Sequence, residues 1–384
     1  MLRVLHIGKF YPPDNGGIES VTASLARGAA KAGNSVGIHC FEEHGKGDSL
    51  DGAVQVYRVP QAIKLASQPL GLNYLWRGWS LARKADLIHV HAPNMLGALL
   101  TLFVPSRVKV VIHWHSDVVG KGLLGRLLGP LEAAMLRRAD RIMCTSQPYA
   151  DASLTVRPFG EKVSVVPLGV PDRRDFSVKS RGELGGAQLP SQLSSHIQGR
   201  PLVLSVGRLV PYKGYVDLID AAKLMHKDAA IVIVGGGPLE KQLQVRIDQL
   251  GLQDRVLLAG RVEDETLSVL LSIATVFCMP SNERSEAFGV ALLEAMMWGL
   301  PVIATKIVGS GVPWVNSHGE SGINVTPSDP VALSAVLDDL LSNKDLRDKL
   351  AAGARARYEA LFTEQKTVDM TLSLYQEVVL GKKA

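Results

Sequence analysis

Residues 281–299 read SNERSEAFGVALLEAMMWG, and the rest of the chain is best understood from this stretch. It follows the apolar run Thr275–Met279 and Pro280, which indicates a buried strand, and it continues as a polar loop and a helix from about Gly289. Gly299 is the expected stop, because glycine commonly follows the last turn of a helix. The stretch therefore predicts a strand–loop–helix unit, from which parallel α/β sheets are built.

Glu294 is the only polar side chain between Val290 and Trp298. A helix that is apolar all round is normally packed all round, so we expect a buried Glu294, and a buried carboxylate needs compensating partners. A solvated Glu294 is the alternative, but such a face would normally carry other charges. Glu286 precedes the helix, where free N–H groups and the helix dipole attract anions. Two carboxylates beside an anion site suit a ligand with both hydroxyl and phosphate groups.

The 384 residues, 46% of them hydrophobic, suit two domains. Met1–Ile7 reads as a strand rather than a signal peptide, and no apolar run is long enough to cross a bilayer, so we expect a cytoplasmic protein.

Cys40, Cys144 and Cys278 lie far apart in strand-like runs, which favours core packing over disulfides or a metal. The net charge of +5 suits phosphate ligands or an anionic membrane, and the absence of a nucleic-acid motif argues against nucleic acid.

Short apolar strands alternate with helix-length segments in each half of the chain. The strands are apolar throughout, which is typical of parallel sheets covered on both faces. The expected strands are Val4–Ile7, Val36–Cys40, Val54–Val59, Leu87–His91, Val108–His113, Ile142–Thr145 and Val163–Val166, then Leu202–Val206, Ile231–Val234, Val256–Ala259, Val276–Met279, Val302–Ala304 and Ile323–Val325. We predict two doubly wound α/β domains, residues 1–172 and 201–362, with strand ends facing a shared cleft. Residues 173–200 read as a linker, and the last helix, 364–380, is expected to pack back on the first domain.

Three loops that follow strands carry residues suited to phosphates. Arg208 and Lys213 are placed to bind a diphosphate, although surface loops commonly carry such cations. Gly235-Gly236-Gly237 lacks the full dinucleotide fingerprint, which disfavours a nicotinamide enzyme. These glycines allow either a close approach of the backbone to a nucleotide or a tight strand-to-helix turn. The pair Gly16-Gly17 leaves the same two alternatives open, a phosphate or sugar contact or a simple turn.

Histidines alternate at two strand ends, His89 with His91 and His113 with His115. Side chains two apart share one face of a strand, so metal ligation is one interpretation. No matching cysteine or carboxylate cluster completes a site, which favours a polar rim at the cleft mouth over a metal. No Asp-x-Asp at a strand end and no GxxxxGK[ST] motif is present, so neither a metal–diphosphate site nor a P-loop is expected.

Two basic, apolar segments are candidates for a membrane surface. They are Gly120–Arg141 and Tyr74–Lys84, the second of which includes Trp76 and Trp79. Each combines basic side chains with large apolar ones, as interfacial helices do. An ordinary core-facing helix is the competing and simpler interpretation for both.

Taken together, these motifs resemble glycosyltransferase family 4, the "group 1" set of retaining GT-B enzymes, over essentially the whole chain. The most specific element is the Glu-x7-Glu spacing from Glu286 to Glu294. Supporting matches are Tyr11-Pro12-Pro13 with Gly16-Gly17-Ile18-Glu19, Gly207-Arg208 with Lys213-Gly214, Gly235-Gly236-Gly237-Pro238 and Pro167-Leu168-Gly169-Val170. The resemblance implies a GT-B fold, with an N-terminal acceptor-binding and a C-terminal nucleotide-sugar-binding domain.

The resemblance also implies roles for single residues. Arg208 and Lys213 would hold the donor diphosphate, Glu294 the ribose hydroxyls and Glu286 the transferred sugar. His115 would lie beside that sugar, and Val262 near the base. The usual Pro-Asn-Gly is replaced by Pro167-Leu168-Gly169, so a role of that Asn does not transfer. The implied catalytic residues are Glu286, His115, Arg208 and Lys213, and the implied donor-binding residues are Gly16, Gly17, Arg208, Lys213, Gly235, Gly236, Val262, Glu286, Phe288, Gly289, Val290 and Glu294.

The region around His115-Ser116-Asp117 looks like bacterial mannosyltransferases of O-antigen and exopolysaccharide assembly. We therefore expect a retaining, metal-independent transferase without a cofactor, which moves a sugar, with GDP-mannose as the expected donor, to a glycan or lipid-linked acceptor. The enzymatic alternatives are a UDP-sugar-dependent glucosyl-, galactosyl- or N-acetylglucosaminyltransferase and a GT-B-like sugar-nucleotide epimerase. The non-catalytic alternative is a nucleotide-sugar-binding scaffold. Peripheral attachment to the inner face of the membrane is compatible with the charge.

Overall fold

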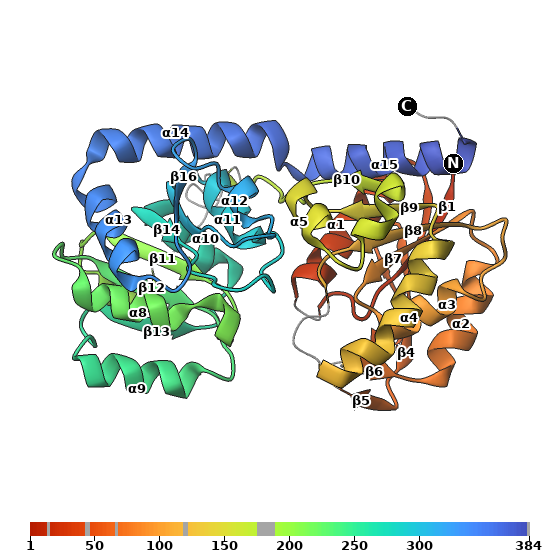
Figure 1. The fold of residues 1–384 in the computed structure, drawn as a ribbon, viewed down its shortest axis with the longest axis horizontal. Coiled ribbons are helices and arrows are strands. Elements are labelled where there is room, and N and C mark those ends of the chain that lie inside the picture. Colours follow the sequence, from red (N-terminus) through yellow and green to blue (C-terminus); the bar gives the residue numbers. More distant parts are fainter. Residues whose placement is uncertain (14–15, 43–46, 66–67, 118–121, 175–188, 382–384) are drawn as a thin grey trace. The chain divides into compact units, whose positions relative to one another are not determined.

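The computed structural model describes residues 1–13, 16–42, 47–65, 68–117, 122–174 and 189–381, and its contacts divide the chain into two compact units (Figure 1). Unit 1 comprises Met1–Leu168 and the C-terminal segment from Glu364. Unit 2 comprises Gly169–Thr363. Each unit is an α/β domain built on its own sheet.

Unit 1 contains an eight-stranded sheet in the order β10-β9-β8-β7-β1-β2-β4-β3, parallel except for β3. The chain proceeds from β1 to β2 on one side and from β7 to β10 on the other, so the direction of winding reverses between β1 and β7. Doubly wound sheets bind ligands at such a switch point. The strands are β1 Arg3–Ile7, β2 Ser35–Glu42, β3 Ser49–Asp51, β4 Val54–Pro60, β7 Leu87–Ala92, β8 Lys109–Trp114, β9 Arg141–Cys144 and β10 Val163–Val165, with a separate hairpin of β5 Ile63–Leu65 and β6 Gln68–Leu70.

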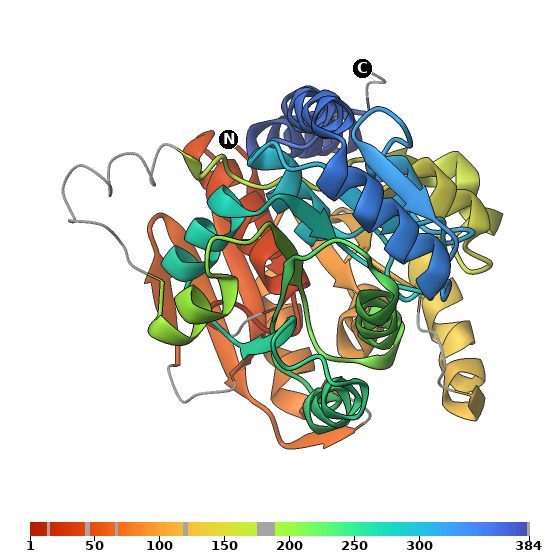
Figure 2. The ribbon, with the colours of Figure 1, turned by 90° about the vertical axis from the view of Figure 1, so that its left-hand side faces the viewer.

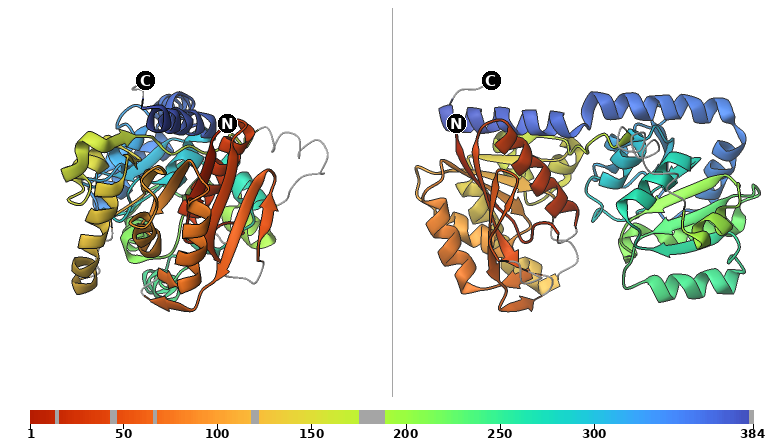
Figure 3. Two further views of the ribbon diagram at one scale, coloured as in Figure 1. Left: turned by 90° about the vertical axis from the view of Figure 1, so that its right-hand side faces the viewer. Right: turned by 180° about the vertical axis from the view of Figure 1, so that it is seen from behind.

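The C-terminal helix α15 (Glu364–Leu380) belongs to the core of unit 1. Its side chains Leu374, Tyr375 and Val378 form one buried cluster with side chains of β1, β7, β8 and β9. It also packs against α1, where a side chain at Gly28 would collide with Val368, and Figure 3 shows the two helices side by side. The other helices of unit 1 are α1 Gly17–Lys31, α2 Leu72–Ala82, α3 Met95–Thr101, α4 Gly122–Arg138, α5 Gln147–Ala152 and the 3-10 helix η1 Arg157–Lys162.

Unit 2 contains a six-stranded parallel sheet in the order β13-β12-β11-β14-β15-β16, and its winding reverses between β11 and β14. Helices α8, α9 and α13 contribute leucine and isoleucine side chains to one buried cluster with β11 and β12. Figure 2 draws the ribbon with the left-hand side of Figure 1 facing the viewer. The strands are β11 Leu202–Val206, β12 Ala230–Val234, β13 Val256–Gly260, β14 Val276–Cys278, β15 Val302–Thr305 and β16 Gly322–Val325. The helices are α7 Ser191–Ile197, η2 Pro211–Lys213, α8 Tyr215–Leu224, α9 Glu240–Leu250, α10 Asp264–Ile273, α11 Val290–Met297, α12 Val312–Val315, α13 Pro330–Ser342 and α14 Lys344–Leu361.

The strands expected from the sequence are present in order, and both sheets are doubly wound, so the predicted fold class is confirmed. The contacts divide the chain after Leu168 and Thr363, whereas the sequence suggested boundaries at 172 and 362. Within the stretch read as a linker, residues 175–188 lie outside the described residues. Ser191–Ile197 forms helix α7, whose Leu193 and Ile197 are buried.

All three cysteines are buried thiols, which confirms the expected core role. Among the described helices none combines the length and apolar character needed to cross a membrane. Of the two candidate membrane segments, Gly120–Arg141 begins outside the described residues. In Tyr74–Lys84, Tyr74 is fully buried and donates its hydroxyl hydrogen bond to the Gly8 carbonyl, so its placement on a membrane surface was wrong, whereas Trp76 is 72% exposed.

Candidate functional site

The carboxyl ends of β11 and β14 carry a buried ion pair at the switch point of unit 2. Lys213 follows β11 and Glu286 follows β14, and Lys213 Nζ lies 2.6 Å from Glu286 Oε2. The two side chains are only 12% and 10% exposed, and the Ser281 hydroxyl donates a second hydrogen bond of 3.0 Å to the same carboxylate oxygen. The sequence placed each residue correctly on its loop, but it assigned them to different parts of a ligand and did not predict that they pair.

Two backbone contacts hold these loops together. Gly214 has φ +66°, and a Cβ at this position would lie 2.1 Å from the Pro280 carbonyl oxygen, so only glycine allows the approach. The Asn282 N–H donates to the Tyr212 carbonyl at 2.9 Å. The backbone therefore fixes the separation of Lys213 and Glu286.

The charge state of Lys213 follows from these contacts. Burial alone would lower the pKa of Lys213, but attraction by Glu286 and their hydrogen bond outweigh burial and raise the pKa above its ordinary value. Lys213 is thus a fixed, charged ammonium group, partly screened by one carboxylate. An anionic ligand would compete with Glu286 for that charge.

Helix α11 begins beside this pair. Gly289 caps it with φ +86°, and the first N–H groups of a helix have no partner within the helix. Val290, Ala291, Glu294 and Trp298 form a partly exposed stripe, so the expectation of a helix packed all round was wrong, and Glu294 is largely but not completely buried. Burial still raises the pKa of Glu294, while Arg173 lowers it and Asp264 raises it. Glu294 is therefore a partly buried carboxylate one turn into helix α11.

The glycine-rich loops of unit 2 interlock at the same edge of the sheet. The Gly235 N–H donates to the Gly260 carbonyl and the Gly207 N–H to the Val234 carbonyl. A Cβ at Gly235, where φ is +138°, would lie 1.9 Å from the Gly207 carbonyl oxygen. Tight turns therefore account for Gly235, whereas Gly236 is partly exposed, with the Arg261 side chain beside its Cα.

The remaining predicted residues of unit 2 differ in exposure. Arg208 is exposed and Val262 partly exposed, so both are open to a ligand. Phe288 is 3% exposed and packs edge-on against Phe362, with Trp314 at 6.3 Å between ring centroids. Any contact of Phe288 with a ligand would therefore come from its backbone.

Unit 1 carries the other predicted residues at the carboxyl end of its sheet. Gly16 is the N-terminal cap of α1 and Gly17 is exposed at its first turn, while Asp14 and Asn15 lie outside the described residues. His115 directly follows β8 and is 7% exposed. Burial, with a smaller effect of Lys9, lowers the pKa of His115 to about 3, so this imidazole is neutral at pH 7.

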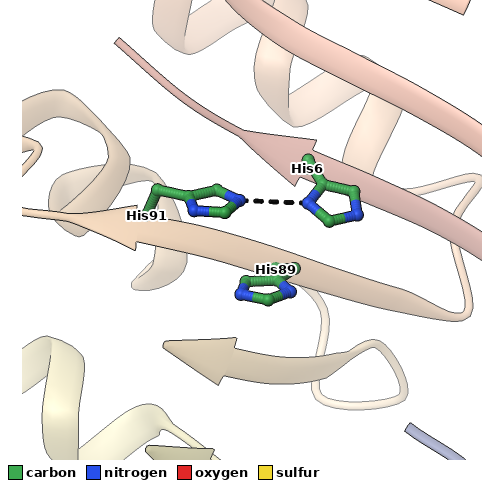
Figure 4. Close-up of side chains that lie close together, drawn as sticks. All are labelled: His6, His89 and His91. Carbon is green, nitrogen blue, oxygen red and sulfur yellow. Dashed lines mark hydrogen bonds between the residues drawn. The ribbon is translucent and has the colours of Figure 1, made fainter. Parts of the chain in front are cut away.

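The other histidines of β7 and β8 do not form a polar rim, and that prediction was wrong. His89, His91 and His113 are at most 1% exposed, because α15 covers this face of the sheet. His6 of β1 joins them, and Nδ1 of His6 lies 3.0 Å from Nε2 of His91 (Figure 4). Neither His6 nor Tyr375, which contacts His89, carried a local sequence signal, since the cluster forms only when distant segments pack together.

A carboxyl group that interacts with Asp117 was also missed. Burial, with a smaller effect of Asp117, raises the pKa of Glu132 on α4 to about 7. Asp117 itself accepts hydrogen bonds from Trp114 Nε1 at 2.8 Å and from the Ser153 hydroxyl at 2.6 Å. Since Glu132 lies on a helix rich in apolar residues, a lone acid among them was the available signal.

Two doubly wound units, one with a cation–carboxylate pair and a helix start at its switch point, define the GT-B class of α/β proteins. The structure resembles that of sucrose-phosphate synthase from Thermosynechococcus elongatus, with a TM-score of 0.78, 21% identity and full coverage of both chains. The family model described as "Glycosyl transferases group 1" matches residues 192–357, and "Glycosyl transferase 4-like domain" matches residues 16–169.

Curated relatives cover nearly the whole chain. The O-antigen chain mannosyltransferase C of Escherichia coli is 31% identical over 388 residues, which is 99% of this chain and 100% of the relative. The D-rhamnosyltransferase WbpZ of Pseudomonas aeruginosa is 33% identical over 366 residues, 94% of this chain and 92% of the relative. The chain belongs to the group 1 glycosyltransferases, and it is a glycosyltransferase.

Proposed function

We propose that the protein transfers a manno-configured sugar, with retention of the α configuration, from a nucleoside diphosphate to a glycan or lipid-linked acceptor during assembly of a bacterial surface polysaccharide. No cofactor takes part, because the fixed charges of the chain replace a metal. The observation that carries the proposal is the Lys213–Glu286 pair at the switch point of unit 2, next to the start of α11. A cation and free N–H groups suit a diphosphate, and Glu286 and Glu294 suit hydroxyl groups.

The proposed reaction needs no further reactant. The bond between C1 of the sugar and the diphosphate oxygen breaks, and the acceptor oxygen bonds to C1 from the same face. The acceptor proton passes to the departing diphosphate, which acts as the base. Lys213, Arg208 and the N–H groups of Gly289 and Val290 stabilise the negative charge that develops on the leaving group. The proposed role of Glu286 is to orient the sugar, and that of Glu294 is to bind the ribose. The nucleotide is proposed to contact Gly235, Gly236 and Val262. The transferred sugar and its phosphate are proposed to contact Gly16, Gly17 and His115.

The names of the two relatives support a manno-configured sugar. Mannose and D-rhamnose differ only at C6, where D-rhamnose lacks the hydroxyl group. GDP-mannose is therefore the donor that we propose. UDP-glucose, UDP-galactose and UDP-N-acetylglucosamine remain the alternatives that the assay must exclude.

A panel of nucleotide sugars tests the proposal. We expect GDP-mannose to raise the melting temperature most, because a ligand that binds only the folded state stabilises it, and the stabilisation is expected to survive EDTA. With a glycan acceptor, GDP should be released together with an α-mannosylated product. If only a UDP-sugar stabilises the protein, that sugar nucleotide and not GDP-mannose is the donor. Epimerisation of the sugar in the absence of an acceptor would indicate an epimerase. Binding without transfer and without slow hydrolysis would indicate a scaffold protein.

We also propose that unit 1 attaches to an anionic membrane surface through α2. An open hollow of about 490 Å³ is lined by Leu72, Leu75, Trp76, Trp79, Leu100 and Phe103. Arg83 lies over the Trp79 ring at 4.5 Å, and the exposed Lys84 follows it. Tryptophan and apolar side chains bordered by cations are typical of interfacial helices. Peripheral attachment would bring the enzyme to a lipid-linked acceptor at the inner face of the membrane.

Binding to vesicles tests this surface. We expect the protein to co-sediment with vesicles containing phosphatidylglycerol but not with purely zwitterionic vesicles, and Trp76→Ser to weaken binding about tenfold, since burying an indole stabilises the bound state by more than about 1 kcal/mol. Leu154→Ser is the matched control, because Leu154 is also exposed (75%) on unit 1 but lies outside the hollow. Equal binding of Trp76→Ser and the wild-type protein would remove α2 from the interface.

A further inference from the structure

A chain of hydrogen-bonded side chains runs through the core of unit 1 and ends at His115. The Tyr375 hydroxyl on α15 lies 2.5 Å from Nδ1 of His89 and 3.5 Å from Nε2 of His6. Nδ1 of His6 lies 3.0 Å from Nε2 of His91, and Nδ1 of His91 lies 3.0 Å from Nε2 of His115. The link between His6 and His91 crosses the switch point between β1 and β7 and can be followed in Figure 4.

Each imidazole of this chain is neutral at pH 7. Burial lowers the pKa of His6 and of His115 to about 3, and it lowers the pKa of His89 and His91 well below the ordinary value. A neutral imidazole has one N–H donor and one bare acceptor nitrogen. Each contact between two rings therefore needs the proton on one side only, so the tautomer of one ring dictates that of the next.

The geometry allows two states of the whole chain. In the first, His89 donates from Nδ1 to the Tyr375 oxygen, Tyr375 donates to His6, His6 to His91 and His91 to His115, so that all four rings carry their proton on Nδ1. In the second, every donor and acceptor is exchanged and all four rings carry it on Nε2. If His89 and His6 both donated to the Tyr375 oxygen, the buried hydroxyl hydrogen would have no acceptor among these rings, which is why His89 changes together with the other three rings.

The buried surroundings of His89 select between these states. Its Nε2 is buried and has no hydrogen-bond partner among the described residues. In proteins, buried backbone N–H groups without an acceptor are rarer than acceptors without a donor. Applied to the imidazole, this preference leaves Nε2 of His89 bare and its proton on Nδ1, which is the first state. Nδ1 of His115 then carries a proton that it can donate to a ligand oxygen.

A metal ion is the competing explanation for the cluster. Ring nitrogens of His6, His89 and His91, and of His91, His113 and His115, lie within 4.8 Å of one another. A metal lies in the plane of every imidazole that binds it, about 2 Å from the nitrogen. The planes of His89 and His91 are only 3° apart with ring centroids separated by 4.6 Å, and His113 stacks on His115 at 3.9 Å and 21°. Stacked rings do not direct their lone pairs at one point, so hydrogen bonding accounts for the arrangement better.

We propose that Tyr375 is a positioning residue that sets the tautomer of His115 through His6 and His91, and so fixes an N–H donor at Nδ1 of His115. The role of this donor in sugar transfer rests on the proposed function, whereas the tautomer itself does not. Through this row of hydrogen-bonded side chains, helix α15 determines whether Nδ1 of His115, which is far from α15 in the sequence, donates or accepts a hydrogen bond. His115 is thereby prepared to bind an oxygen of the ligand without rearrangement.

Nitrogen NMR of ¹⁵N-histidine-labelled protein tests the proposal, because ring nitrogen shifts report which nitrogen carries the proton. We expect His6, His89, His91 and His115 of the wild-type protein all to be protonated on Nδ1. In Tyr375→Phe we expect His115 to become a mixture of both tautomers, since the link to His89 is lost. A mixture or an Nε2 proton at His115 in the wild-type protein, or stoichiometric zinc in the purified protein, would overturn the proposal without needing any variant.

Tyr74→Phe is the matched control. Tyr74 is also fully buried in unit 1 with a hydroxyl that has two hydrogen-bond partners, Gly8 and Asn94, but it is not part of the chain. We expect Tyr74→Phe to keep the wild-type tautomer of His115. In transfer assays, Tyr375→Phe should lower kcat on the order of tenfold with little change in KM. The expected tautomers in a protein without transferase activity would refute the proposed function and leave the positioning role intact, whereas an unchanged His115 in Tyr375→Phe would refute that role.

Discussion

Sugar transfer is expected to fall by two to three orders of magnitude when Lys213 or Glu294 is replaced by alanine, but in different kinetic constants. Lys213 is a charged group fixed before the ligand arrives, and charge develops on the diphosphate only as the sugar departs. Removing such a stabilising group typically costs about 10²–10³ in kcat. Glu294 is proposed to bind hydroxyl groups that do not change during the reaction, so Glu294→Ala should act mainly by raising KM.

The controls must separate activity from folding. Lys213→Ala leaves Glu286 buried without its cation, and breaking a buried pair costs about 3–5 kcal/mol of folding free energy. Urea unfolding should therefore accompany the assays, and Lys213→Ala/Glu286→Ala should be more stable than Lys213→Ala yet equally inactive. Exposed residues on α9 provide matched controls, Lys241→Ala and Glu240→Ala, which should retain wild-type rates. Wild-type kinetic constants in Lys213→Ala or Glu294→Ala would refute the role assigned to that residue.

The sequence predicted the fold and the loops that carry the site, because these depend on local patterns. Apolar strands, the glycine that ends α11 and the positions of Lys213 and Glu286 after two strands are all encoded within short stretches. The pairing of these two side chains depends on which strands are neighbours. Since β11 and β14 are separated in sequence by two strands but adjacent in the sheet, spacing along the chain does not reveal it.

Burial was the property that the sequence predicted least well. The apolar composition of α11 suggested a helix packed all round, but one stripe of that helix, which includes Glu294, is partly exposed. Conversely, the polar character of His89, His91 and His113 suggested a rim, although α15 covers them. In both cases burial depends on whether an element from elsewhere in the chain covers the side chain, so the composition of the helix or strand alone is insufficient.

The buried histidines make unit 1 sensitive to acid, and we expect it to unfold between about pH 6.5 and pH 5 while unit 2 remains folded. Burial lowers the pKa of six histidines of unit 1: His6, His39, His89, His91, His113 and His115. In the unfolded chain each titrates near pH 6.5. Below that pH the unfolded state binds protons that the folded state does not, so the free energy of unfolding falls as the pH falls.

The size of the effect decides the outcome. From pH 7.5 to pH 5.5, each such histidine lowers the free energy of unfolding by about 1 kcal/mol, so the six together remove several of the roughly 5–15 kcal/mol that stabilise a typical domain. In unit 2, His226 and His318 are exposed, and burial lowers the pKa of the partly buried His196, so this unit has one such histidine against six in unit 1 among the described residues. Hydrogen exchange followed by mass spectrometry between pH 7.5 and pH 5 should therefore show peptides of unit 1 losing protection first. His113→Leu removes two buried ring nitrogens that have no hydrogen-bond partner in the described part of the chain, and it should make this loss less steep, because one fewer site takes up a proton on unfolding. Equal loss of protection in both units, or a His113→Leu variant as acid-sensitive as the wild-type protein, would show that these histidines titrate in the folded state and are not held neutral by burial.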